Sequence, residues 1–294
     1  MAHISTQGDS VARITVLPNG VTASFPRVGP LAEQSAKRGK VQGWSVQSTR
    51  RLRRWFYAVD GQALDGAGWA VTLTVRDLPP KPEDWKEVRE RFVARTRRAG
   101  LLRGQWLTEF QRRGVPHLHG VFYFPGEVRT VGEELVAHWL AAAADYGPAA
   151  RGQTAKKVTG LVGWLQYQAK HSVRGVKHYQ RATVPEAWRE GTGRLWGVVG
   201  EWPTREEVIE VSAADYHRFR RLLRGWLVAE ARRQGDVHRA AWLRGLLRDP
   251  DPKRSRVRAV GEFCPEELAN RMVAAAQLRE RVPVVDLETG EILR

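Results

Sequence analysis

The pattern of apolar and polar residues predicts an alternation of strands and helices. Short runs rich in branched and aromatic residues, or alternating with polar ones, indicate strands. Apolar residues recurring at spacings of three and four indicate helices. The expected strands are residues 11–16, 21–25, 69–75, 107–111, 115–124 and 193–200. The expected helices span about residues 45–59, 83–99, 131–144, 161–174, 213–226, 240–247 and 265–281.

This order of elements indicates an α+β protein. Strand, helix, strand and strand over residues 69–124 suit a ferredoxin-like or RRM-like domain with a central antiparallel sheet. The composition changes to basic helix from residue 213 onward. We therefore expect an N-terminal arm with a hairpin over residues 1–44, a central domain over 45–212 and a basic helical C-terminal region over 213–294.

The sequence of the central hairpin, formed by the expected strands 107–111 and 115–124, predicts how its two strands pair. Only residues 112–114 separate its strands, and Gly114 supplies the positive φ that the last position of a three-residue loop needs. This loop places Glu109 directly across from His117. Side chains two apart on a strand point to one face, so His119 lies on the same face as His117.

Two imidazoles and a carboxylate on one face form a three-ligand metal set. Neutral imidazoles suit many divalent ions, and the carboxylate tilts the preference toward Mg²⁺ or Mn²⁺. Three protein ligands with open coordination positions are typical of a catalytic metal site. The alternative is a pair of half-exposed strand histidines, but the facing Glu109 and the apolar neighbours favour a metal. We expect this face of the sheet to be exposed.

The net charge predicts a polyanionic partner. The 294 residues include 48 Lys+Arg and 32 Asp+Glu, a formal charge of +16, and the sequence pI is near 10.7. This balance favours nucleic acid, because a merely solubilising charge need not be so large.

The single cysteine, Cys264, fits a reducing cytoplasm. The sequence shows no secretory signal, membrane span or P-loop, so we expect a cytoplasmic protein without its own helicase.

A second candidate stretch lies on the predicted helix over residues 161–174. Tyr167 and Lys170 are three residues apart and share a helix face, and His171 is four residues from Tyr167. A tyrosyl oxygen with a free pKa near 10 is a poor nucleophile, and a neighbouring ammonium favours the phenolate. Tyr179 is the rival nucleophile. It lies twelve residues from Tyr167, which does not give the adjacent helical turns of a paired-tyrosine site.

Together the two stretches resemble one family. The string Gly-Val-Pro-His-Leu-His at 114–119, with Glu109 on the preceding strand, resembles the HUH endonucleases, and among them the rolling-circle replication initiators. The spacing of Tyr167 and Lys170 downstream resembles that family's third motif.

Further segments extend the resemblance over roughly residues 45–200. The strand that carries Thr72 and Thr74 resembles the family's first motif, and Gly-Arg-x-Trp-Gly at 193–197 is similar to a segment of the initiators. His171 and Arg174 depart mildly from the family, because an aromatic residue and a second lysine often stand there.

The resemblance implies an HUH nuclease domain over residues 45–212 and a single-tyrosine enzyme. Glu109, His117 and His119 would hold Mn²⁺ or Mg²⁺. Tyr167, assisted by Lys170, would attack single-stranded DNA at a replication origin and form a 5′-phosphotyrosine. The free 3′-hydroxyl would prime a polymerase of the host.

Basic residues near these motifs are the expected DNA-binding residues, and the ligand is single-stranded DNA or an origin hairpin. A separate host helicase, polymerase and single-strand-binding protein are the expected partners, with no membrane. The expected DNA-binding residues are Arg50, Arg51, Arg112, Arg113, Arg174, Lys177 and Arg181.

Two alternatives stay open from the sequence. A transposase or relaxase of the same superfamily would share this chemistry. A nucleic-acid-binding protein without catalytic activity would bind DNA and form no covalent adduct. The helices after residue 213 suit either an origin-binding module or a helical cap.

Overall fold

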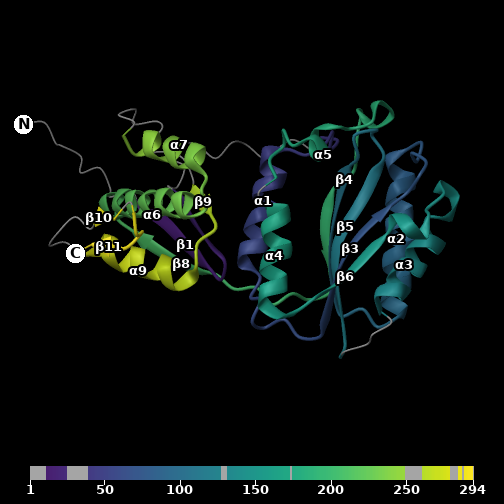
Figure 1. Ribbon diagram of the computed structural model, residues 1–294, viewed down its shortest axis with the longest axis horizontal. Coiled ribbons are helices and arrows are strands. Elements are labelled where there is room, and N and C mark those ends of the chain that lie inside the picture. Colours follow the sequence, from purple (N-terminus) through teal and green to yellow (C-terminus); the bar gives the residue numbers. More distant parts are fainter. Residues whose placement is uncertain are drawn as a thin grey trace, which may run out of the picture. The chain divides into compact units, whose positions relative to one another are not determined.

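The protein forms two compact units, each built around its own sheet (Figure 1). This computed structural model describes residues 11–24, 39–126, 131–172, 174–248, 260–278, 284–286 and 288–293. The larger unit comprises residues 32–56 and 60–203, and the smaller one comprises residues 1–31, 57–59 and 204–294. The fold is α+β with a central antiparallel sheet and a C-terminal helical region, as the sequence predicts.

A five-stranded antiparallel sheet forms the centre of the larger unit. Its strand order is β6-β3-β5-β4-β7. The expected closing strand, β7, pairs with β4 at one edge, which confirms a strand in the second half of the predicted range 193–200. The strands are β3 (Ala67–Thr74), β4 (Arg103–Phe110), β5 (Pro116–Phe124), β6 (Thr154–Val158) and β7 (Trp196–Val199).

Helices cover both faces of this sheet (Figure 1). Helices α1 (Val46–Ala58) and α4 (Gly160–Ser172) lie on one face, and α2 (Pro82–Arg98) and α3 (Val131–Ala142) lie on the other. Aromatic rings pack between the sheet and the helices on each face. The ring centroids of Phe56 and Trp164 are 5.9 Å apart, and those of Phe92 and Phe122 are 5.4 Å apart. The short helix α5 (Tyr179–Ala182) packs near β4. Among the described residues of this unit, 3₁₀ turns lie at Ala144–Tyr146, Ala150–Gly152 and Glu186–Trp188.

Local sequence signals explain where these helices begin. The Ser45 hydroxyl accepts a hydrogen bond from the Ser48 backbone N–H at 3.0 Å, which satisfies a free donor of α1. Helix α2 begins with Pro82, whose missing N–H costs nothing at a first turn. The Asp84 carboxylate accepts from the Lys81 N–H at 2.9 Å. Both helices were expected over nearly the same residues.

The central hairpin has the predicted register. Glu109 pairs with His117 and Leu107 pairs with His119. The loop closes with a hydrogen bond from the Gln111 N–H to the Val115 carbonyl at 2.9 Å. Gly114 has φ +82°, the left-handed conformation that a side chain would strain.

The smaller unit packs helices against a four-stranded sheet of order β8-β1-β2-β9. Long helix α6 contacts α7 and α9, and its apolar stripe joins Ile14 and Val21 of the sheet in one core. A two-stranded ribbon, β10–β11, completes the unit. The elements are β1 (Ala12–Leu17), β2 (Gly20–Ser24), β8 (Glu207–Val211), α6 (Ala213–Arg233), α7 (Val237–Arg248), β9 (Val260–Glu262), α9 (Glu266–Gln277), β10 (Val284–Val285) and β11 (Ile292–Leu293).

The division of the chain differs from the three parts expected. The N-terminal hairpin is not an arm by itself, because β1 pairs with β8 and β2 pairs with β9. These pairings satisfy both edges of a two-stranded hairpin that is marginal alone. Residues 207–211 fall within the central domain expected over 45–212, but they form strand β8 and belong to the smaller unit. Within the described residues, no helix combines the length and apolarity that crossing a membrane would require.

Candidate metal and tyrosine site

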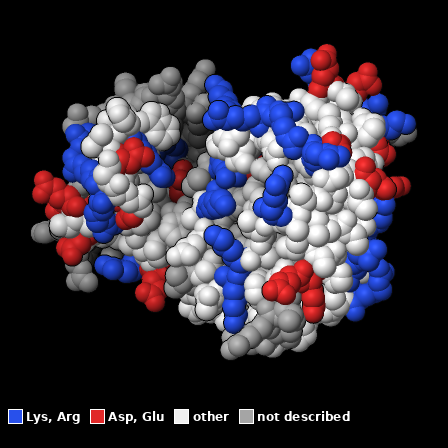
Figure 2. All heavy atoms as spheres, turned by 45° about the vertical axis from the view of Figure 1, so that its right-hand side comes forward, with Lys and Arg blue, Asp and Glu red and all other residues white. Residues whose placement is uncertain are grey.

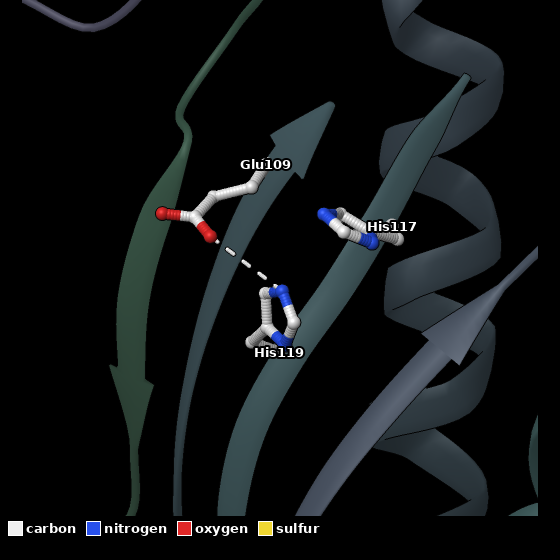
Figure 3. A group of neighbouring side chains, drawn as sticks. All are labelled: Glu109, His117 and His119. Carbon is white, nitrogen blue, oxygen red and sulfur yellow. Dashed lines mark ion pairs between the residues drawn. The ribbon is translucent and has the colours of Figure 1, made fainter. Parts of the chain in front are cut away.

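Glu109, His117 and His119 converge on one face of the larger sheet, as the hairpin register predicts (Figure 3). Glu109 comes from β4 and both histidines come from β5. Their candidate ligand atoms all lie within 4.8 Å of one another. The centroids of the two imidazole rings are 4.4 Å apart. The backbone pairing of one hairpin therefore assembles the whole three-residue set.

The site is buried, contrary to the exposed sheet face expected from the sequence. Glu109 is 0%, His117 7% and His119 4% exposed. Helix α4 and the segment after it cover this face; the His171 ring lies 5.0 Å from that of His119. The long apolar stripe of α4 needs a partner surface, and the sheet supplies it. A substrate would have to reach the site past this cover.

Both histidines are held in the neutral form. Burial lowers the pKa of His117 to about 4, with smaller contributions from Arg174 and Lys170. Burial also lowers the pKa of His119 well below its usual value, and the neighbouring His117 adds to the shift. Neutral imidazoles keep the lone pair that a metal needs.

The surroundings of His119 fit a divalent ion. Thr72 Oγ1 lies 3.0 Å from His119 Nδ1, as its place on the neighbouring strand predicts. The tautomer that donates from Nδ1 to Thr72 leaves the Nε2 lone pair free. His119 Nε2 is buried, accepts no hydrogen bond among the described residues and lies 3.5 Å from Glu109 Oε2 (Figure 3). A nitrogen so placed beside a carboxylate oxygen is a suitable ligand pair for a divalent metal ion.

The pKa of His117 predicts an acid sensitivity of the metal-free protein. The unfolded chain takes up a proton near pH 6.5, whereas folded His117 does so only near pH 4. Stability is thus complete above pH 6.5 and falls as the pH drops toward 4. Between pH 7 and 5 His117 should account for a loss of about 2 kcal/mol in the free energy of unfolding.

Urea unfolding in EDTA at pH 7 and pH 5, followed by tryptophan fluorescence, measures this loss. His117→Gln should show a pH dependence smaller by about that amount. His238→Gln, at an exposed position, should keep the wild-type pH dependence. An unchanged pH dependence in His117→Gln would contradict the assignment.

Glu109 pairs with two arginines, Arg174 and Arg181, that the sequence predicts to bind DNA. Arg181 Nε donates to Glu109 Oε1 at 3.1 Å, and Arg174 pairs with Oε2. The Arg181 side chain has no exposed surface. Buried carboxylates need such compensation, because an unpaired charge in the interior is costly. Arg181 therefore holds Glu109 in place and does not lie on the surface where it would meet DNA.

Tyr167 lies on the buried face of α4, and its hydroxyl donates to Gln105 Oε1 at 2.7 Å. Burial raises the pKa of Tyr167 well above 10, and the charge of Glu109 raises it further. Lys170 is exposed. Lys170 is not among the groups that shift the pKa of Tyr167, so the lowering of the tyrosine pKa expected from this lysine is not found. Arg174 is the cation that favours the phenolate.

His171 connects Tyr167 to the metal-ligand face. Its ring centroid lies 4.8 Å from that of Tyr167 and 5.0 Å from that of His119. The helical spacing of four placed His171 beside Tyr167, but its contact with His119 depends on how α4 crosses the sheet. Gln105 was not predicted from the sequence as a site residue. Its position four residues from Glu109 places it on the same face of the strand and could have indicated it.

Comparison with known proteins shows extensive similarity to replication proteins. A putative replication protein of Xylella fastidiosa strain 9a5c is 44% identical over 241 residues, covering 79% of this chain and 84% of that protein. A replication-associated protein of Pseudomonas phage Pf3 is 40% identical over 233 residues, 78% of this chain and 84% of its own. The chain belongs to this family of replication proteins. No family model and no solved structure matches it.

The other expected DNA-binding residues of the replication protein are all exposed. Arg113 also donates to the backbone carbonyls of Arg76 and Val75 at 2.7 and 3.1 Å, so it braces the hairpin loop. Figure 2 shows Lys and Arg side chains across the face that it presents. The exposed residues of the expected set are Arg50, Arg51, Arg112, Arg113 and Lys177.

The rival tyrosine of the replication protein lies at the surface. Tyr179 is 45% exposed and begins the short helix α5. The Arg112 guanidinium lies over its ring, 5.2 Å from the centroid. The next residue, Gln180, places its Nε2 3.3 Å from His117 Nε2. Both tyrosines thus lie on segments that contact the metal-ligand set. Tyr167 is buried, whereas Tyr179 is exposed to solvent.

Proposed function

We propose that this replication protein initiates replication by nicking and rejoining single-stranded DNA at an origin, with HUH-type, metal-dependent chemistry. The observation that carries the proposal is the buried set Glu109, His117 and His119, joined through His171 to Tyr167. The replication-associated relatives and the net charge of +16 support DNA as the substrate.

The proposed roles follow from the chemistry of each group. Glu109, His117 and His119 would hold Mn²⁺ or Mg²⁺, which supplies Lewis-acid polarisation of a phosphate oxygen when bound. Tyr167 exchanges its hydrogen bond with Gln105 for a contact with the scissile phosphate. Its oxygen forms a bond to phosphorus while the bond from phosphorus to the 3′-oxygen breaks. In the balance of the step, the phenolic proton is transferred to the 3′-oxygen, which leaves as a hydroxyl.

Lys170 and the exposed cations have supporting roles in this proposal. Lys170 is exposed and lies near the C-terminal end of α4, where an ammonium can bind a phosphate of the DNA. Arg50, Arg51, Arg112 and Lys177 bind the backbone elsewhere. The 3′-hydroxyl primes a host polymerase, and a separate helicase and single-strand-binding protein open the duplex in the cytoplasm.

The test of this function is a covalent adduct. Labelled single-stranded origin DNA with Mn²⁺ should give a band shift that survives denaturation, and EDTA should abolish it. The double variant His117→Ala, His119→Ala should reduce the adduct by at least about a hundredfold, because it removes two of three ligands. Its circular dichroism spectrum serves as the folding control.

Two results would contradict the proposal. Full adduct formation by the double-histidine variant would place the metal chemistry elsewhere. Tight DNA binding with no adduct, even on a random pool of sequences, would favour a binding protein without nicking activity.

A further inference from the structure

The segment after α4 contacts two of the three candidate metal ligands. Arg174 pairs with Glu109 Oε2, and Arg181 Nε donates to Glu109 Oε1 at 3.1 Å. Gln180 Nε2 lies 3.3 Å from His117 Nε2. The same groups that would bind a metal therefore already have partners from residues 174–181.

The two arginines on Glu109 have different surroundings. Arg181 is fully buried, donates from one terminal nitrogen to the His171 carbonyl at 2.9 Å and also donates to the Arg174 carbonyl. Its guanidinium lies 4.2 Å from the ring centroid of Trp44. The Arg174 side chain is 15% exposed, and Glu109 is the hydrogen-bond partner shown for its guanidinium among the described residues. Arg181 is anchored by several groups, whereas Arg174 depends on one.

The two carboxylate oxygens also differ in what they face. Oε2 is the oxygen that lies 3.5 Å from the unbonded His119 Nε2. An ion that is bound jointly by His119 and Glu109 would therefore use Oε2. That is the oxygen Arg174 holds, while Arg181 holds Oε1. When two cations compete for one buried oxygen, each binds less tightly than it would in the absence of the other.

We propose that Arg174 and the divalent ion compete for Glu109 Oε2, so that metal binding releases Arg174 to contact a phosphate of single-stranded DNA. Arg181 stays on Oε1 throughout and keeps the carboxylate oriented. The inference rests on the proposed function, which supplies both the metal ion and the single-stranded DNA. It adds a coupling: metal binding creates a free guanidinium beside the scissile position, where bidentate phosphate binding is strong.

The coupling predicts opposite effects of one substitution. Arg174→Gln removes the competitor, so the metal should bind more tightly, by about tenfold or more. The same variant should bind single-stranded DNA more weakly in the presence of metal, because the released cation is missing. An arginine that only stabilises the fold would weaken both.

Isothermal titration of the full chain with Mn²⁺ alone tests the competition. Arg174→Gln should lower the dissociation constant, and Arg189→Gln should leave it unchanged. Arg189 is a matched control, because it lies at the surface of the same unit and its side chain is 70% exposed. Thermal unfolding shows whether Arg174→Gln is folded. An unchanged or raised dissociation constant in the folded variant would overturn the inference while leaving the metal site standing.

A second measurement uses the wild-type chain and needs no variant. Phenylglyoxal modifies accessible arginines, and mass spectrometry locates the product. Mn²⁺ should increase modification at Arg174 severalfold and leave Arg181 protected. If Mn²⁺ binds without exposing Arg174, the competition is wrong. If Mn²⁺ binds neither the wild type nor Arg174→Gln, the proposed metal site and this inference both fail.

Discussion

Tyr167→Phe should abolish the covalent protein–DNA adduct while leaving Mn²⁺ binding intact. The substitution removes the one oxygen that would bond to phosphorus, so adduct formation should fall by at least about a thousandfold. Metal binding should persist, because Glu109, His117 and His119 are unchanged. The denaturing gel measures the adduct, and titration calorimetry measures Mn²⁺ binding.

The same variant carries a stability cost that must be separated from catalysis. The Tyr167 hydroxyl donates to Gln105 Oε1 at 2.7 Å, and Gln105 Nε2 has no hydrogen-bond partner among the described residues. Losing that hydrogen bond should cost about 1–3 kcal/mol. Assays should therefore run well below the melting temperature of the variant.

Tyr179→Phe is the matched control for the nucleophile. Tyr179 is exposed, so its loss should leave both stability and adduct formation near wild type. The reverse outcome, with an active Tyr167→Phe and an inactive Tyr179→Phe, would transfer the nucleophile to the surface tyrosine. Mass spectrometry of the wild-type adduct gives an independent assignment.

Arg181→Leu should destabilise the larger unit by about 3–5 kcal/mol, the typical cost of breaking a buried ion pair from one side. Arg181 and Glu109 both have 0% side-chain exposure, so solvent screens little of their interaction. The variant also leaves the carbonyl of His171 without its donor at 2.9 Å. Urea unfolding at pH 7 in EDTA measures the loss.

A double variant tests whether the loss comes from the uncompensated charge. Arg181→Leu combined with Glu109→Gln removes both charges and should recover part of the stability lost in Arg181→Leu alone. An exposed pair is the comparison: Arg13 and Glu210 have side chains that are 62% and 59% exposed. Arg13→Leu should cost less than about 1 kcal/mol. A cost of that small size in Arg181→Leu would show that Glu109 is compensated by other groups.

Most of the longer helices and strands, and the register of the central hairpin, follow from the amino-acid sequence alone. The three-residue loop with Gly114 leaves one pairing of its strands, and the period of two along a strand then places His119 beside His117. The helical character of α4 and the proximity of Tyr167 to His171 also follow from short-range spacing. Each of these features depends on residues only a few positions apart.

The surroundings of those residues depend on contacts between distant parts of the chain. Arg181 lies 72 residues from Glu109 in the sequence and Tyr167 lies 62 from Gln105, and no local period relates such positions. Basic residues look alike in a sequence whether they pair with DNA or with a buried carboxylate. The pairing of the N-terminal hairpin with β8 joins still more distant positions, such as Ala12 and Val211. Burial of the metal-ligand face, and with it the raised pKa of Tyr167, arises because α4 packs across the sheet.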